Sequence, residues 1–368
     1  MHPRNRNLLF LLTPLLLGIL CSGQSTDPTP AASSSSPASP NAKATQSTQP
    51  VSPVQPQATG SQPPASKPAV SSEQPEATQA QPDDSGVFVF KKEVDEVVLH
   101  ATVVDDKQRM VTTLDKGAFS IFENGTPQTI TSFRHEDIPV AMAIVIDNSG
   151  SMREKRLKVN QAALNLVRSS NPQDQVFIVN FNDEYYLDQD FTSDINKLKE
   201  ALEKIEARGG TALYDAVVAS ADHLKRNARL ERKVLFVVTD GEDNASRESL
   251  EQAVRRLQEE NGPTVYAIGL LGEEKARRAR RALETMSERT GGIAFLPKTL
   301  DEVDAISRTV AHDIRIQYTI GYKPTTPKTA GGYRTIKVDA KAHGYSKLTV
   351  RTKTGYYAGQ ERASTAPQ

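Results

Sequence analysis

The middle of the chain alternates between apolar runs and amphipathic segments. Val140 to Ile146 is a nearly unbroken apolar run, which predicts a β-strand buried on both faces. Residues 155–169 then carry apolar side chains at helical spacing, and the side chains expected to face the sheet are Leu157, Ala162, Leu166 and Val167. The pattern continues with predicted strands at 176–181, 184–191, 233–239, 264–270 and 293–296 and predicted helices at 194–207, 212–226, 247–260, 274–290 and 301–314. This alternation predicts an α/β fold: a doubly wound, mostly parallel six-stranded sheet with helices on both faces.

Short strand-like segments flank this region on both sides. The predicted strands lie at 87–92, 96–104, 119–123 and 128–133 before it and at 316–322, 333–340, 347–352 and 355–357 after it. Asn124-Gly125 predicts a tight turn between two of them. We hypothesise that the N- and C-terminal strands pair into one small β-sandwich, an antiparallel β unit into which the α/β domain is inserted.

The first 85 residues have a different composition. From Gln24 to Ser85 there is no Ile, Leu, Met, Phe, Tyr or Trp, and 12 of the chain's 22 prolines lie there. Such a segment buries too little apolar surface to offset its chain entropy, which predicts a disordered linker rich in Pro, Ser, Ala and Gln.

The N-terminus has the layout of a secretory signal. Two arginines precede an apolar run from Leu8 to Leu20, and small residues follow at Cys21, Ser22 and Gly23. As a helix the run would span about 20 Å, short of the ~30 Å hydrocarbon core of a bilayer. The pattern predicts an exported protein that is secreted, periplasmic or associated with the cell envelope. Cleavage after Gly23 is one alternative, and acylation of Cys21, which would tether the chain to a membrane, is the other.

We therefore expect six segments: a signal peptide (1–23), the linker (24–85), an N-terminal β unit (86–138), the α/β domain (139–314), C-terminal β strands (315–358) and a tail (359–368).

Charge and cysteine usage exclude several classes of protein. The 45 Lys and Arg residues balance 45 Asp and Glu residues, so no nucleic-acid-binding surface is indicated. Cys21 is the only cysteine and lies before the folded region. A disulfide framework, a Cys-ligated zinc site and a thiol nucleophile are therefore not expected.

Three loops carry oxygen ligands where predicted strands lead into helices. The first contains Asp147, Ser149 and Ser151, the second Thr211, and the third Asp240. In open α/β sheets such loops meet at the carboxyl end of the strands. Five hard oxygen donors without nitrogen or sulfur suit Mg²⁺, with Mn²⁺ or Ca²⁺ as alternatives. The competing interpretation is that Ser149 or Ser151 caps the following helix.

The charge of this site indicates its ligand. If Asp147 and Asp240 are the only anions, they just neutralise a divalent ion, and if one of them acts through water, the ion keeps net positive character. One octahedral position remains for an outside group, for which a carboxylate of a partner protein is suited. Activation of water for hydrolysis is an alternative, but no histidine accompanies the loops, and we expect neither catalytic residues nor an organic cofactor.

Residues 139–314 resemble a von Willebrand factor type A domain, and the three loops resemble its metal-ion-dependent adhesion site. The DxSxS motif of that family falls on Asp147, Ser149 and Ser151, its threonine on Thr211 and its third-loop aspartate on Asp240. The resemblance implies a bound divalent ion, usually Mg²⁺, that holds an acidic residue of a protein ligand. The flanking segments 114–133, 318–322 and 351–356 resemble the bacterial, acidobacterial-type group of proteins related to this family.

Other charged residues are less specific. We expect Glu242 and Asp243 to be solvated loop acids, Asp215 to lie at a helix start, and Arg277 to Arg281 to form an exposed face with neighbouring glutamates. The expected function is non-enzymatic, metal-dependent protein binding or adhesion. A metal-assisted hydrolase and a structural scaffold of an envelope complex are the alternatives, and the oligomeric state and the partner are not predicted.

Overall fold

A six-stranded mixed sheet forms the centre of the α/β domain. The computed structural model describes residues 96–272 and 276–359, so the predicted signal peptide, the predicted linker, the predicted strand 87–92 and the end of the predicted tail lie outside the described residues. The strand order is β10-β9-β8-β5-β6-β7. The five parallel strands are β5 (Val140–Asp147), β6 (Gln175–Phe181), β8 (Arg232–Thr239), β9 (Thr264–Gly269) and β10 (Ala294–Phe295), and β7 (Tyr185–Thr192) is antiparallel at one edge. The predicted fold class is confirmed.

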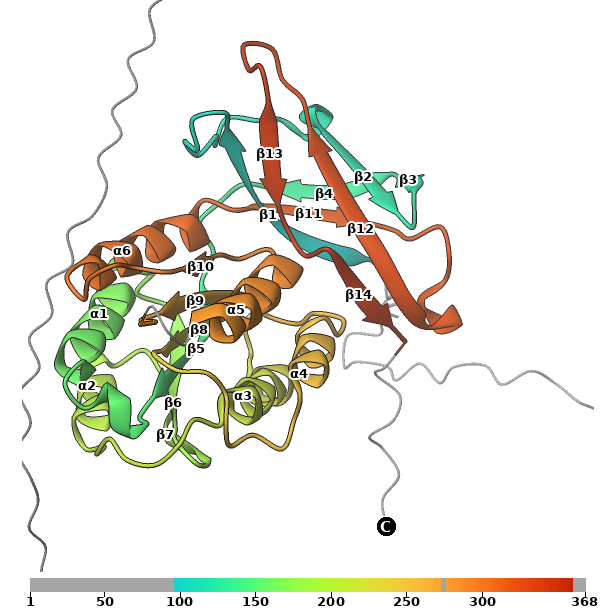
Figure 1. Ribbon diagram of the computed structural model, residues 1–368. Helices are drawn as coiled ribbons and strands as arrows, with labels where there is room; N and C mark the ends of the chain where they lie inside the picture. Colours follow the sequence, from blue (N-terminus) through green and yellow to red (C-terminus); the bar gives the residue numbers. More distant parts are fainter. Residues whose placement is uncertain (1–95, 273–275, 360–368) are drawn as a thin grey trace, which may run out of the picture. The chain divides into compact units, whose positions relative to one another are not determined.

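Helices cover both faces of this sheet (Figure 1). One face packs on α1 (Arg156–Ser169), α2 (Ile195–Glu203) and α6 (Glu302–Arg315), and the other on α3 (Leu213–Asn227), α4 (Leu250–Leu257) and α5 (Ala276–Thr290). Successive β5 side chains alternate between the two cores: Met142 and Ile144 join the first, and Ala143 and Val145 the second. This double coverage explains why all of β5 is buried.

The predicted orientation of α1 is wrong at one position. Leu157 is 83% exposed, whereas Val159, Ala162 and Leu166 are buried. These three residues follow helical spacing, and Leu157 lies about 180° around the helix from Leu166 at 100° per residue. The apolar stripe therefore begins at Val159, and Leu157 faces solvent.

The N- and C-terminal strands pair into two antiparallel sheets, as expected from the pattern. One has the order β13-β1-β11-β4 and the other β14-β12-β2-β3. The strands are β1 (Val97–Asp105), β2 (Phe119–Glu123), β3 (Thr126–Gln128), β4 (Ile130–Arg134), β11 (Tyr318–Tyr322), β12 (Gly332–Ala340), β13 (Leu348–Arg351) and β14 (Gly355–Ala358), with single turns of 3₁₀ helix at Lys116–Ala118, Gly150–Met152 and Lys328–Ala330. Both sheets contribute to one buried core, which includes Leu99, Ile121 and Tyr318.

The connection between β2, β3 and β4 differs in part from the expectation. Asn124 and Gly125 have φ values of 49° and 80°, which supports the predicted tight turn. The single strand predicted at 128–133 is wrong, because the chain leaves one sheet after Gln128 and enters the other at Ile130. Both residues are buried, so the alternating pattern continues through the corner and conceals it.

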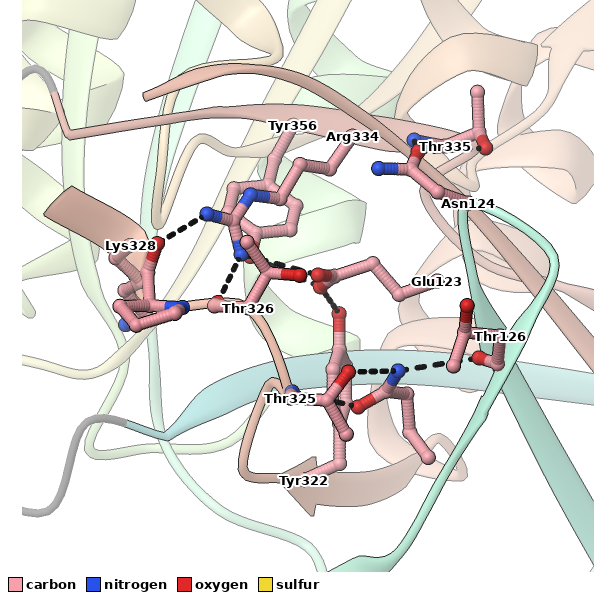
Figure 2. Close-up of polar contacts among 12 residues, drawn as sticks. Glu123, Asn124, Thr126, Tyr322, Thr325, Thr326, Lys328, Arg334, Thr335 and Tyr356 are labelled. Carbon is pink, nitrogen blue, oxygen red and sulfur yellow. Dashed lines mark hydrogen bonds and ion pairs between the residues drawn. The ribbon is translucent and has the colours of Figure 1, made fainter. Parts of the chain in front are cut away.

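A buried ionic cluster lies within this β unit (Figure 2). Glu123 and Arg334 form an ion pair at 3.0 Å in which both side chains are 3% exposed. The other carboxylate oxygen of Glu123 accepts hydrogen bonds from the hydroxyls of Tyr322 at 2.5 Å and Tyr356 at 3.1 Å. Burial, followed by the Glu123 carboxylate, raises the pKa of both tyrosines, so both hydroxyls remain donors.

Hydrogen bonds also join the β unit to the α/β domain. The buried Arg232 guanidinium, which opens β8, donates to the Ile314 carbonyl at 2.7 Å and to Thr319 Oγ1 at 3.1 Å. The Tyr266 hydroxyl in β9 donates to Asp313 at 2.8 Å, and Arg351 in β13 donates to the same carboxylate at 3.0 Å.

Within residues 96–272 and 276–359, no helix combines the length and apolar character needed to cross a membrane.

The carboxyl of Asp174 should give the stability a defined pH dependence. It accepts hydrogen bonds from the amides of Val140 and Asn171, but burial raises its pKa to about 6, above the ~3.9 of an unfolded aspartate. Its contribution to stability is therefore full below about pH 4 and is lost as pH rises through about 6. Between pH 5 and pH 7, the wild-type protein should lose about 1 kcal/mol of unfolding free energy relative to Asp174→Asn. Urea unfolding at both pH values measures this, and identical pH dependence in the two proteins would contradict it.

Candidate metal centre

Backbone hydrogen bonds bring the three predicted loops together. The first loop follows β5, the second precedes α3 and the third follows β8. The Gly150 amide donates to the Gly209 carbonyl at 3.2 Å, which joins the first and second loops. The Thr211 amide donates to Asn244 Oδ1 at 2.9 Å, and the Asn244 amide donates back to the Thr211 carbonyl at 3.0 Å. These paired bonds join the second and third loops.

Asp147 is the innermost residue of the site. It is 0% exposed, and its carboxylate accepts hydrogen bonds from the Ser149 amide at 2.8 Å and from Thr239 Oγ1 at 2.6 Å. Burial raises the pKa of Asp147; the two hydrogen-bonding partners oppose the rise, and the nearby Asp240 charge adds to it. A buried carboxylate of this kind gains from a cation beside it.

The two serines connect Asp147 to Asp240. The Ser149 and Ser151 hydroxyl oxygens are 3.2 Å apart, and Ser151 Oγ donates to Asp240 Oδ1 at 2.8 Å. Neither side chain caps a helix: Ser149 makes no side-chain bond at the start of the 3₁₀ turn, and the N-cap of α1 is Lys155. The interpretation of the serines as helix caps is therefore wrong.

Thr211 completes the set of oxygen donors. Its hydroxyl lies beside Gly241, since a Cβ added to Gly241 would be 3.4 Å from Thr211 Oγ1. Together the five predicted residues offer two carboxylates and three hydroxyls, the hard donors that suit Mg²⁺, Mn²⁺ or Ca²⁺. The Asn148 side-chain oxygen in the first loop is also buried, without a hydrogen-bond partner. The donor chemistry fits a divalent cation, and the assignment of these residues as its ligands stays a prediction.

The hydroxyls are essential to this interpretation. In the part of the chain that the structure describes, no three His, Cys, Asp or Glu residues come close enough to hold a metal ion. A centre at this position would combine the carboxylates of Asp147 and Asp240 with neutral hydroxyl ligands.

Lys155 belongs to the site but was not predicted from the sequence. Its ammonium forms an ion pair with Asp240 Oδ2, the oxygen that Ser151 does not use. The signal in the sequence is a cation at the first position of the predicted helix 155–169, where the helix dipole disfavours it. Its partner Asp240 lies 85 positions further along the chain, so no local sequence pattern indicates the pair.

Two acids near the site accept hydrogen bonds from neighbouring segments, and one of them differs from expectation. Asp243 is half-buried and accepts hydrogen bonds from the Tyr214 amide at 3.0 Å and from Ser246 Oγ at 2.5 Å, so its interpretation as a solvated acid is wrong. Asp215 lies in the first turn of α3, as predicted, and accepts from the Glu248 amide at 2.9 Å.

Two further polar contacts involve the second and third loops. Asp183, which was not predicted, accepts from the Gly210 amide at 2.8 Å and fixes the second loop. Glu242 pairs at 3.1 Å with Arg278, whose side chain is 86% exposed. Arg277, Arg278, Arg280 and Arg281 are all exposed, as expected for the basic face of α5.

Replacing Asp243 with alanine should lower the stability of the protein, because Asp243 connects the third loop to the start of α3 after the second loop. The N-cap of α3 is Ala212, which has no capping side chain, and Asp243 supplies the missing acceptor at the second residue of the helix. We expect the free energy of unfolding to fall by about 1–2 kcal/mol. Glu242→Ala, which removes only the exposed pair with Arg278, should cost less than about 0.5 kcal/mol. Equal losses in the two variants, measured by urea unfolding, would contradict the capping role.

Comparisons with known proteins identify the type of the α/β domain. Residues 142–242 match the family model of the von Willebrand factor type A domain. Calcium-activated chloride channel regulator 3A-1 of Mus musculus is 32% identical over 178 residues, which make up 45% of this chain and 18% of that protein. The chain spans less than a fifth of the length of the curated relatives it matches.

Two solved structures are similar at low sequence identity. A von Willebrand factor type A protein from Catenulispora acidiphila is 14% identical, with a TM-score of 0.42, and the match covers 73% of this chain and 74% of the other. Proximal thread matrix protein 1 from the mussel byssus, in a structure whose MIDAS motif is occupied by zinc, is 18% identical, with a TM-score of 0.41 and coverage of 53% and 50%.

Proposed function

Because the chain contains a von Willebrand factor type A domain, a family with roles in adhesion and protein interaction, we propose that it is a metal-dependent binding module. Asp147, Ser149, Ser151, Thr211 and Asp240 would hold one divalent cation, with Mg²⁺ as the proposed ion. The bound ion would supply Lewis acidity toward an anionic oxygen. The proposed ligand is an acidic group on a partner protein.

The observation that carries this proposal is the hydrogen-bonded series Asp147–Ser149–Ser151–Asp240 at the meeting of the loops. Hydrogen bonds join the main chains of the three loops, so the oxygen donors are held in place before a ligand binds. Pre-organisation of this kind reduces the entropic cost of binding a cation and then a partner.

The surrounding acids favour binding over hydrolysis. A hydrolase would need a general base beside the open coordination position. The Asp243 carboxylate already accepts hydrogen bonds from the Tyr214 amide and the Ser246 hydroxyl, and Glu242 forms an ion pair with Arg278. With both acids engaged elsewhere, we propose that the protein is not an enzyme.

The proposed location is outside the cytoplasm. It rests on the basic, apolar and small-residue pattern of residues 1–23 and on the long polar linker that follows. A binding domain exported on such a linker could reach partners in the cell envelope or beyond it.

Metal-dependent capture tests the proposed function. The purified chain, immobilised in buffer containing Mg²⁺, should retain a specific protein from the envelope fraction of the producing organism and release it into EDTA. Asp240→Ala should retain none, whereas Asp301→Asn, which removes an exposed carboxylate elsewhere, should behave as wild type. Retention that is insensitive to EDTA or survives in Asp240→Ala would favour the scaffold alternative.

A further inference from the structure

The Asp240 carboxylate is shared between a hydroxyl and an ammonium. Ser151 Oγ donates to Oδ1 at 2.8 Å, and Lys155 Nζ pairs with Oδ2. The side chain of Asp240 is 0% exposed, while that of Lys155 is 28% exposed. The lysine therefore brings a positive charge from the surface to the Oδ2 atom of a proposed metal ligand.

Helix stability does not explain this lysine. Lys155 is the N-cap of α1, and the first turn of α1 contains no acidic residue, although the helix dipole favours anions at this end. Neighbouring cations point to other partners: Arg156 donates to the Leu202 carbonyl, and Lys158 pairs with Asp301. Of these three basic residues, Lys155 is the one in contact with a proposed metal ligand.

A charge count indicates what Lys155 does. Asp147 and Asp240 give the site a formal charge of −2, and Lys155 reduces it to −1. A divalent cation would then leave a net charge of +1 instead of neutrality. We propose that Lys155 is a specificity-determining residue that weakens cation binding and keeps the loaded centre positive, so that it selects anionic ligands. This inference rests on the proposed function, because it requires a cation at the three loops.

Electron paramagnetic resonance can monitor Mn²⁺ binding to the purified chain. This measurement tests the first half of the proposal, that Lys155 weakens cation binding. Lys155→Met should bind Mn²⁺ about tenfold more tightly than wild type, because one repulsive charge has been removed. Lys155→Arg keeps the charge and should bind as wild type does. Lys158→Met removes a charge from the same helix but not from Asp240, and it should also leave Mn²⁺ affinity unchanged.

The direction of change separates this role from a structural one. If Lys155 only positioned Asp240, its loss would loosen the ligand and weaken Mn²⁺ binding. Lys155→Gln provides a second uncharged variant that retains hydrogen bonding, and it should tighten binding as Lys155→Met does. Thermal unfolding in EDTA checks that each variant is folded.

A carboxylate probe tests the second half. Acetate titrated into the Mn²⁺-loaded chain should displace inner-sphere water, measured by water-proton relaxation, and should do so several-fold more weakly in Lys155→Met than in wild type. Unchanged or weaker Mn²⁺ binding in both uncharged variants, or equal acetate affinity, would overturn this inference alone. Absence of Mn²⁺ binding to wild type would overturn the proposed function and this inference with it.

Discussion

Replacing Arg334 with methionine should lower the free energy of unfolding by about 3–5 kcal/mol, because it leaves a buried carboxylate without its counter-charge. Glu123 would keep the hydroxyls of Tyr322 and Tyr356 but lose its ion pair (Figure 2). The Thr326 carbonyl would also lose a donor at 2.7 Å. Urea unfolding at neutral pH measures the loss.

Two controls make this prediction specific. Lys337→Met on the same strand removes an exposed pair with Asp339, whose side chains are 71% and 41% exposed, and should cost less than about 1 kcal/mol. Adding Glu123→Gln to Arg334→Met should recover part of the loss, because the unpaired charge is removed. A cost below about 1 kcal/mol for Arg334→Met alone would show that the buried Glu123 carboxylate does not depend on its counter-charge.

Asp147→Asn should abolish most metal affinity while leaving the fold intact. We expect Mg²⁺ or Mn²⁺ binding to weaken by at least about 100-fold, because one of only two anionic donors is lost. The asparagine oxygen can still accept from the Ser149 amide, and Thr239 can turn its hydroxyl hydrogen away so that Oγ1 accepts from the new NH2 group. The buried charge also disappears, so stability in EDTA should not fall.

Calorimetric titration with Mg²⁺, together with urea unfolding in EDTA, measures both halves of the prediction. Asp301→Asn serves as the matched control, because its carboxylate is 83% exposed and pairs with Lys158. If Asp147→Asn unfolds, Asp240→Asn tests the same loss of charge from the third loop. Wild-type affinity in a folded Asp147→Asn or Asp240→Asn protein would show that these carboxylates are not ligands.

The sequence was most informative where local pattern and burial agree. The run from Val140 to Ile146 is apolar because both faces of β5 are covered, so its length and end could be predicted directly. Asp147 is the last residue of β5 and Asp240 directly follows β8, and these two strands are neighbours in the sheet. The convergence of their loops therefore follows from the strand order of this fold class.

Local patterns failed where several partners or a change of sheet were involved. Leu157 is apolar and near a helical stripe, yet it lies on the opposite face of α1 from Leu166. The corner at Thr129 maintains the alternation of buried residues and so resembles one strand. Neither error could be detected without the positions of neighbouring elements.

Roles that depend on long-range hydrogen bonds were also missed. Lys155 and Asp240 are 85 positions apart, and Tyr214 and Asp243 are 29 positions apart. Spacing identifies residues that share one loop, such as Ser149 and Ser151, but not a side chain from another segment that supports them. Such partners emerge only once the loops are placed together.

Diffraction from crystals soaked in Mn²⁺ tests the central claim most directly. An anomalous difference map should contain one strong peak among the oxygens of Asp147, Ser149, Ser151, Thr211 and Asp240, and the peak should be absent in crystals of Asp240→Ala. No peak among these oxygens at saturating Mn²⁺, with the three loops open to solvent in the lattice, would contradict a metal centre at this end of the sheet.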